Sequence, residues 1–247
     1  MSTPLIRICD IRKKFGSKEA LKGVSFDLYA GELVSLLGVN GAGKTTLSTI
    51  VATLHPPSKG DMLYQERSIY GNLPAYRQII GYCPQKPNLN PLLTVRKNLE
   101  YAGEYYGMSR EQIEKRLVEL NQQLGINEYL DAKSDELSGG WKQRFMLART
   151  LIHSPKLIIL DEPTVALDPD IRNQLWHYIE QIKAEGVSIL LTTHYLEEAE
   201  RLSDRVVVLH AGEVKLIDTP SNLMRSFEKG RLEDVFLELT REKKDPL

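Results

Sequence analysis

The fold is decided by the stretch Gly38-Val39-Asn40-Gly41-Ala42-Gly43-Lys44-Thr45, which fits the pattern G-x-x-x-x-G-K-[ST] of a phosphate-binding loop. An apolar run at 33–37 precedes it and a helix-like run at 45–54 follows it, so strand, loop and helix occur in the required order. Glycines let backbone N–H groups approach phosphate oxygens, and the start of a helix favours an anion. The motif predicts a nucleotide-binding loop made of Gly38, Val39, Asn40, Gly41, Ala42, Gly43, Lys44, Thr45 and Thr46.

Two adjacent carboxylates follow a second apolar run. Residues 157–160 are all apolar and lead directly into Asp161 and Glu162. An open parallel sheet binds its ligands beyond the carboxyl ends of its strands, so these acids are expected beside the phosphates. We predict that Lys44 reaches the β- and γ-phosphates, that Thr45 and Asp161 hold Mg²⁺, and that Glu162 polarises an attacking water. The alternative is a solvated turn at the end of the strand.

Length and composition limit the architecture. The 247 residues suffice for one large domain, with or without a subdomain, but not for a second complete nucleotide-binding domain. With 42% hydrophobic and 26% charged residues, the chain has the composition of a folded α/β protein. The net charge of −1 and the lack of a long basic run argue against a nucleic-acid partner. Its apolar runs are far shorter than the ~20 residues that span a bilayer, so we expect a cytoplasmic chain.

The spacing of apolar residues divides the chain into segments. Short strand-like runs between 5 and 64 predict an antiparallel sheet. Two helices, at 94–106 and 110–124, are expected to form an inserted helical subdomain. From 141 to 209 helices alternate with buried strands, which predicts a mostly parallel sheet. The expected domain covers 5–240, with a nucleotide-binding core and β subdomain at 5–85 and 137–217, the helical subdomain at 86–136 and a C-terminal helical extension at 218–247.

The stretch Leu137-Ser138-Gly139-Gly140 precedes a predicted helix, about twenty residues before the two carboxylates. Here the chain resembles the ATP-binding cassette (ABC) transporter family, whose signature is LSGGQ. The resemblance extends from about Leu5 to Thr240. It implies an α/β fold, with a P-loop NTPase core, an antiparallel β subdomain and an inserted α-helical subdomain, that uses ATP and Mg²⁺. It also implies that Ser138, Gly139 and Gly140 contact the γ-phosphate held by a second chain. Taken alone, Ser138 is equally an ordinary helix cap.

Other positions match further motifs of the family in the family's order. The resemblance implies that Gln85 contacts Mg²⁺ or the attacking water, and that Asp168 lies at a dimer interface. His194 matches the switch histidine, and Phe15 matches the aromatic residue that stacks on adenine, with Val24 beside it. Taken alone, Gln85 fits a polar loop residue, His194 a strand-end cap and Phe15 a core or hairpin residue.

Two residues depart from the family's pattern. Trp141 stands where the signature has glutamine, and Val165 stands where a serine is common. Neither position supplies the backbone that binds phosphate or the carboxylate that activates water. We therefore expect an active ATPase, with the catalytic roles on Glu162, His194 and Gln85.

The resemblance also implies partners. It predicts a second ABC ATPase subunit, most simply another copy of this chain, and a separate transmembrane permease subunit that docks near Gln85 and residues 92–95. The chain would then be peripheral on the inner face of the membrane. The segment 232–240 resembles the end of ATPase subunits of ABC-2 type exporters, although its pattern equally fits a generic amphipathic helix. The alternatives are a soluble non-transport ABC ATPase, for example one in iron–sulfur assembly, and an ATP-binding regulator.

Overall fold

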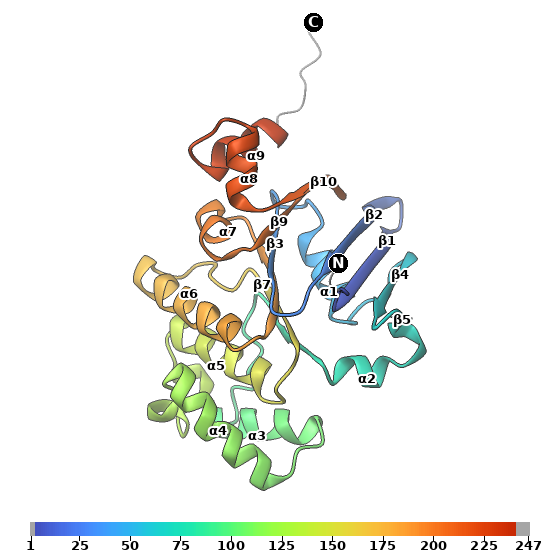
Figure 1. Ribbon diagram of the computed structural model, residues 1–247. Coiled ribbons are helices and arrows are strands. Elements are labelled where there is room, and N and C mark those ends of the chain that lie inside the picture. The colour runs from blue at the N-terminus through green and yellow to red at the C-terminus, as the bar shows by residue number, and fades with distance from the viewer. Residues whose placement is uncertain (1–2, 241–247) are drawn as a thin grey trace, which may run out of the picture.

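The computed structural model describes residues 3–240, and two β-sheets form its centre (Figure 1). The strands are β1 (Ile6–Phe15), β2 (Lys18–Leu28), β3 (Leu33–Leu37), β4 (Lys59–Tyr64), β5 (Arg67–Ser68), β6 (Ile80–Cys83), β7 (Leu157–Asp161), β8 (Ser188–Thr193), β9 (Arg205–His210) and β10 (Glu213–Asp218). The helices are α1 (Lys44–Val51), α2 (Leu73–Arg77), α3 (Val95–Tyr105), α4 (Arg110–Leu124), α5 (Gly139–Leu151), α6 (Pro169–Ala184), α7 (Leu196–Leu202), α8 (Pro220–Ser226) and α9 (Leu232–Thr240), with single 3-10 turns at Ile69–Gly71, Asn127–Tyr129 and Ser134–Glu136.

The larger sheet has the strand order β10-β9-β3-β8-β7-β6, and only β10 runs antiparallel to its neighbour. Every residue of β3, β7 and β8 is buried, as expected for strands covered on both faces. The register pairs Leu37 with Thr193 and Asp161 with Thr192. The segments that follow these three strands therefore leave the sheet at the same edge. The prediction of a mostly parallel sheet is confirmed.

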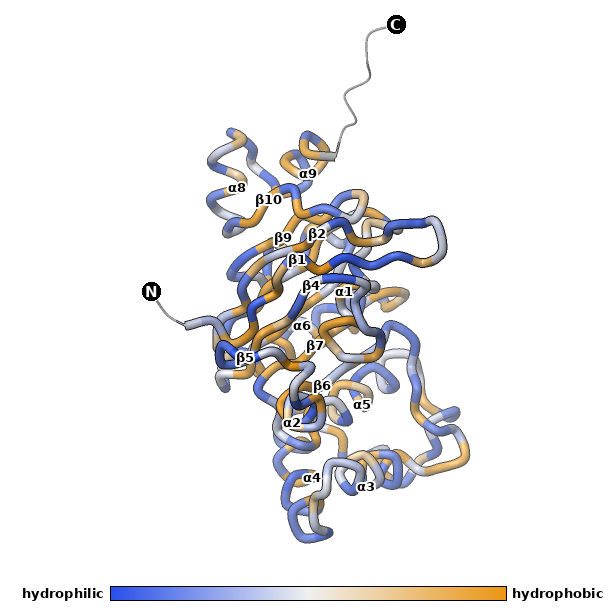
Figure 2. Tube along the Cα trace, turned by 90° about the vertical axis from the view of Figure 1, so that its right-hand side faces the viewer, coloured by the Kyte–Doolittle hydropathy of each residue, from blue (hydrophilic) through white to orange (hydrophobic). Residues whose placement is uncertain are grey.

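The smaller sheet is antiparallel, with the order β2-β1-β4-β5. It lies beside α1, and apolar residues of β1 and β2 pack with Leu47 of α1 and with the apolar residues of the larger sheet in one hydrophobic cluster. Figure 2 shows the hydrophobic residues along the central strands and many hydrophilic residues along the β1–β2 hairpin. The predicted antiparallel layer is present. Its second strand begins at Lys18, six residues before the expected start at Val24.

The helices α3 and α4 lie at the end of the molecule opposite α8 and α9 (Figure 1). Thr94 caps α3, and Ser109 and Gln112 form a capping box at the start of α4. Leu99 and Leu117 belong to the same hydrophobic cluster as Phe145 of α5 and Leu160 of β7. The helical region thus shares its core with the sheet. The domain limits at 86 and 136 stay a prediction.

Besides the 3-10 turns, five short elements were not individually predicted from the sequence: α2, β5, β6, β10 and α8. Each has seven residues or fewer, which is too short for a periodic pattern to stand out. The helix α9 matches the segment predicted at 232–240, whereas the part of the C-terminal extension after 240 lies outside the described residues. Within residues 3–240, no helix combines the length and the hydrophobicity that a membrane span requires.

Candidate functional site

The predicted phosphate-binding loop joins β3 to α1, and two of its glycines are required by the packing around them. A Cβ atom on Gly38 would lie 2.4 Å from the carbonyl oxygen of Leu209. Gly43 has a φ of +109°, which side chains rarely adopt, and a Cβ there would lie 2.8 Å from the side chain of Leu21. The neighbouring strands therefore fix the path of the loop, and α1 begins directly at Lys44.

Lys44 is buried and already has partners. Its Nζ donates to the carbonyl oxygens of Gly38 at 2.7 Å and Val39 at 3.3 Å. The same atom lies 3.4 Å from Oε1 of Glu162. Burial lowers the pKa of Lys44, while the Glu162 carboxylate acts in the opposite direction. The ammonium group is thus held at the loop by acceptors that phosphate oxygens can replace.

The oxygen atoms expected to hold Mg²⁺ come from two elements. The hydroxyl of Thr45 donates to Oδ1 of Asp161 at 3.2 Å, so the first residue pair of the predicted metal site is assembled. Thr192 donates to the same Oδ1 at 2.5 Å. Burial raises the pKa of Asp161, although the hydrogen bonds from Thr192 and Thr45 act against this. A hydroxyl next to a carboxylate suits a hard cation that prefers oxygen ligands and keeps several waters.

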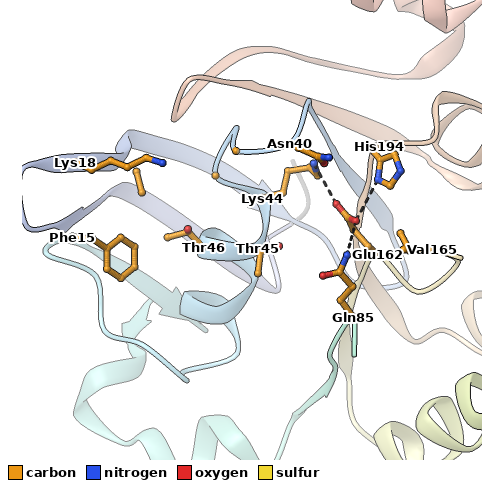
Figure 3. Close-up of a pocket in the computed structure, with 13 residues that line it drawn as sticks. Phe15, Lys18, Asn40, Lys44, Thr45, Thr46, Gln85, Glu162, Val165 and His194 are labelled. Carbon is orange, nitrogen blue, oxygen red and sulfur yellow. Dashed lines mark hydrogen bonds and ion pairs between the residues drawn. The ribbon is translucent and has the colours of Figure 1, made fainter. Parts of the chain in front are cut away.

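Three side chains converge on the carboxylate of Glu162 (Figure 3). Lys44 approaches Oε1, whereas Gln85 donates its Nε2–H to Oε2 at 3.0 Å and Nδ1 of His194 lies 3.3 Å from Oε2. The backbone of Glu162 has a φ of +48°, and its N–H donates to the carbonyl oxygen of Thr192 at 3.0 Å. Of the three residues predicted to be catalytic, Gln85 and His194 thus both contact Glu162, next to the predicted phosphate-binding lysine.

An open cavity of about 590 Å³ lies over the loop. Its lining comes from the β1–β2 hairpin, from the phosphate loop with the start of α1, and from the segments that follow β6, β7 and β8. It consists of Phe15, Lys18, Ala20, Asn40, Gly41, Gly43, Lys44, Thr45, Thr46, Gln85, Glu162, Val165 and His194. Phe15 is 51% exposed, and Nζ of Lys13 lies 5.2 Å from the centre of its ring. Val24 is fully buried in the core and does not line the cavity, so the expectation that it lies beside Phe15 at the adenine is wrong.

The predicted signature residues do not line this cavity. Ser138 caps α5, and its Oγ accepts from the N–H of Trp141 at 3.5 Å. A Cβ on Gly140 would lie 2.6 Å from Ile171 of α6, so this glycine allows α5 and α6 to approach closely. Asp168 stands at the N-terminal cap position of α6, and its side chain makes no capping hydrogen bond. These residues therefore form a second surface, separate from the phosphate loop within one chain.

The two departures from the family's pattern have different surroundings. The ring of Trp141 packs against Tyr129 at a centroid distance of 4.3 Å, and the guanidinium of Arg144 lies 4.1 Å from the centre of the Trp141 ring. Trp141 thus attaches the start of α5 to the turn that follows α4. Val165 lines the cavity directly.

Several residues of the site were missed from the sequence. Lys18 and Ala20 line the cavity, and Thr192 binds both the Asp161 side chain, through its hydroxyl, and the backbone of Glu162. The one available signal was that Thr192 lies at the end of a buried strand, two residues before His194, as Asp161 lies at the end of another. The strand register was needed to place them opposite each other.

Comparisons with known proteins agree with this geometry. The ABC transporter family model matches residues 21–165. The Nod factor export ATP-binding protein I of Bradyrhizobium diazoefficiens is 41% identical over 212 residues, which cover 86% of this chain and 69% of that protein. A solved ATP-binding subunit of an ABC transporter is 33% identical with a TM-score of 0.85, covering 95% of this chain and 99% of that one. A dimeric cassette in a post-hydrolysis state with ADP and Pi is 29% identical with a TM-score of 0.78, covering 87% of this chain and 98% of that one.

Replacing Lys44 by alanine should abolish tight ATP binding. Lys44 is the lysine that the loop holds in place for phosphate, and losing a charge-assisted contact costs about 1.5–3 kcal/mol, or roughly 10- to 150-fold in affinity. A direct titration with ATP measures the change, and Lys22→Ala, an exposed lysine of β2, is the control. Equal affinities for the two variants would refute the assignment of the loop.

Proposed function

The chain belongs to the ABC transporter family, and from that premise we propose how it uses ATP. It is an ATP-binding and ATP-hydrolysing subunit that powers a membrane transporter of the export type. The roles proposed for individual residues are supported by one arrangement of side chains. Lys44, Gln85 and His194 converge on the carboxylate of Glu162, beside a loop whose shape suits phosphate.

The reaction is the transfer of the γ-phosphoryl group of ATP to water. In such reactions the protein mainly positions groups and stabilises charge. When the phosphates enter, their oxygens replace the carbonyls and the carboxylate that now surround Lys44. Glu162 then loses its cation and is free to accept a hydrogen bond from water, while Gln85 and His194 keep it oriented. Phosphate binding thereby prepares the general base.

Mg²⁺ is the proposed second cofactor. Thr45 and Asp161 would hold it, with Gln85 at the edge of the site, since these residues present oxygen atoms near the phosphate loop. When bound, the ion neutralises part of the charge on the phosphate oxygens.

The two alternatives raised by the sequence, a soluble non-transport ATPase and an ATP-binding regulator, gain no support from a relative named for export.

We propose that two copies of the chain form two composite sites. Each site would combine the cavity of one chain with Ser138, Gly139, Gly140 and Asp168 of the other. Two observations support this arrangement. These residues do not line the cavity of their own chain, and the related cassette with ADP and Pi is a dimer. The start of α5 has the free N–H groups and the dipole end that suit a phosphate held by the partner.

The membrane subunit is proposed to dock in a cleft of about 410 Å³ beside α3. Tyr101, Tyr105 and Arg149 are among the residues that line it, and Tyr105 is 77% exposed. Nη1 of Arg149 donates to the carbonyl oxygen of Asn88 at 2.9 Å, so the cleft contacts the segment that follows Gln85. Exposed aromatic rings are common anchors of protein interfaces. Of the residues 92–95 predicted to dock, Leu92 is 84% exposed, but Val95 is buried and takes no part.

Glu162→Gln should bind ATP as the wild type does and hydrolyse it at least 10²-fold more slowly, because a positioned base contributes about 10²–10⁴-fold. Phosphate release under saturating ATP gives the turnover rate, and a nucleotide titration gives the affinity. The matched control is Glu66→Gln, an exposed carboxylate near β5. Turnover of Glu162→Gln within about threefold of the control would remove Glu162 from the role of base.

Ser138 and Ser109 provide a test of the composite site, because each caps a helix but only Ser138 belongs to the signature. Each change to alanine should cost about 1 kcal/mol of helix stability. Only Ser138→Ala should also lower turnover, by about tenfold, since it loses a hydrogen bond to a charged phosphate.

If two chains form each site, the activity of the wild-type protein must depend on the protein concentration. Activity per chain should rise with protein concentration in step with the dimer fraction, followed in parallel by light scattering. Full activity per chain under conditions where only monomer is present would contradict a site made by two chains.

A photoreactive residue in place of Tyr105 should crosslink to an integral membrane protein in membranes of the native cell. Tyr105 is the most exposed of the aromatic residues that line the cleft, so a docked segment must pass close to it. The control is the same substitution at Tyr70, next to β5 and outside the cleft. Mass spectrometry identifies the product. If both positions give the same product, or neither reacts, the docking proposal is wrong.

A further inference from the structure

One buried carboxylate has no part in the mechanism above. Glu198 lies in α7, four residues after His194, and its side chain is fully buried. Its Oε1 accepts two hydrogen bonds, from the hydroxyl of Thr164 at 2.9 Å and from the indole N–H of Trp176 at 2.8 Å. Its Oε2 has no hydrogen-bond partner among residues 3–240. Burying such a group is costly, and an apolar residue of similar size would pack without that cost.

Thr164, which donates a hydrogen bond to Glu198, lies in the turn that follows Glu162, the proposed base. Glu162 and Ala166 both have positive φ values, of 48° and 60°. Such conformations are strained for residues other than glycine, so surrounding contacts must hold them. Within the turn, the N–H of Leu167 donates to the carbonyl oxygen of Thr164 at 3.3 Å. The hydroxyl of Thr164 ties the middle of this turn to Glu198.

Glu198 is connected to the other side of the base as well. Thr193 directly precedes His194, and its hydroxyl accepts from the N–H of Tyr195 at 2.9 Å. Burial raises the pKa of Glu198, whereas the side chains of Thr193, Trp176, Thr164 and Arg172 lower it. The helix α7, which carries Glu198, begins at Leu196, two residues after His194. Trp176 belongs to α6, the helix that begins at Asp168. One carboxylate therefore links the Glu162 turn, the His194 segment and α6.

We propose that Glu198 is a positioning residue for ATP hydrolysis. It holds the backbone turn after Glu162 in a fixed position relative to His194. The inference rests on the proposed role of Glu162. Glu198 does not line the cavity, so it acts on the orientation of the base and not on ATP binding. Its link through Thr164 serves this role, whereas its link to Trp176 anchors the carboxylate to α6.

The two donors to Oε1 provide matched variants. Thr164→Val and Trp176→Phe each remove one hydrogen bond of nearly equal length to the same oxygen. Thr164→Val should lower kcat by about tenfold, as expected for a lost hydrogen bond to a charged group, and leave the affinity for ATP within about twofold. Trp176→Phe should destabilise the fold at least as much, because it also loses buried volume, yet leave kcat within about twofold.

The conservative change at Glu198 completes the test. Glu198→Gln keeps an oxygen acceptor and should retain most of kcat, whereas Glu198→Leu should lower kcat by more than tenfold with the affinity for ATP unchanged. If Glu198→Leu does not fold, the comparison of Thr164→Val with Trp176→Phe still tests the positioning role of Glu198. Equal losses of kcat for Thr164→Val and Trp176→Phe, in proportion to stability, would mean that Glu198 is only structural. Glu162→Gln is assayed alongside, and full activity of that variant would overturn the proposed role of Glu162, on which this inference rests.

Discussion

The parallel register of β3, β8 and β7 is the constraint on which the site depends. Because the three strands run in the same direction, the phosphate loop, His194 and the two carboxylates all leave the sheet at one edge. A shift of one residue would turn alternate side chains to the opposite face. Asp161 would then lose Thr45 and Thr192, both of which reach Oδ1 only in the present register. Complete burial of these strands fixes that register, since a slip would leave their polar ends in the core.

The sequence predicted the parts of the site that depend on local patterns. A loop of defined composition between a strand and a helix fixes its own geometry, so residues 38–45 could be assigned directly. The roles of Thr192 and Glu198 could not, because each depends on contacts with segments about thirty residues away. The prediction that Val24 lies beside Phe15 was wrong for a related reason. Irregular pairing along β1 and β2 places it opposite Ile11 in the core, and no pattern within β2 reveals this.

The charges of the site compensate one another before ATP is bound. A buried ammonium group and two buried carboxylates would each cost several kcal/mol if they were isolated. Here Lys44 has two carbonyl acceptors and Glu162, and Asp161 has three hydroxyl donors. Binding of ATP is therefore an exchange of partners at Lys44 and not the first satisfaction of an unpaired charge. The free energy of the exchange is smaller than the Coulomb attraction alone, and part of it goes into releasing Glu162.

The cavity and the signature surface are mechanically connected within one chain. From Ser138, α5 packs closely on α6 at Gly140, and α6 begins at Asp168, six residues after Glu162. Glu198 then joins α6 to the Glu162 turn through Trp176 and Thr164. Close-packed elements of this kind move as units and do not deform gradually. In the proposed dimer, a partner chain that contacts Ser138 or Asp168 would act on the backbone that carries Glu162 along the chain itself, because α6 begins at Asp168, six residues after Glu162. The link from Trp176 to Glu198 would hold α6 in place during this movement and would not transmit it.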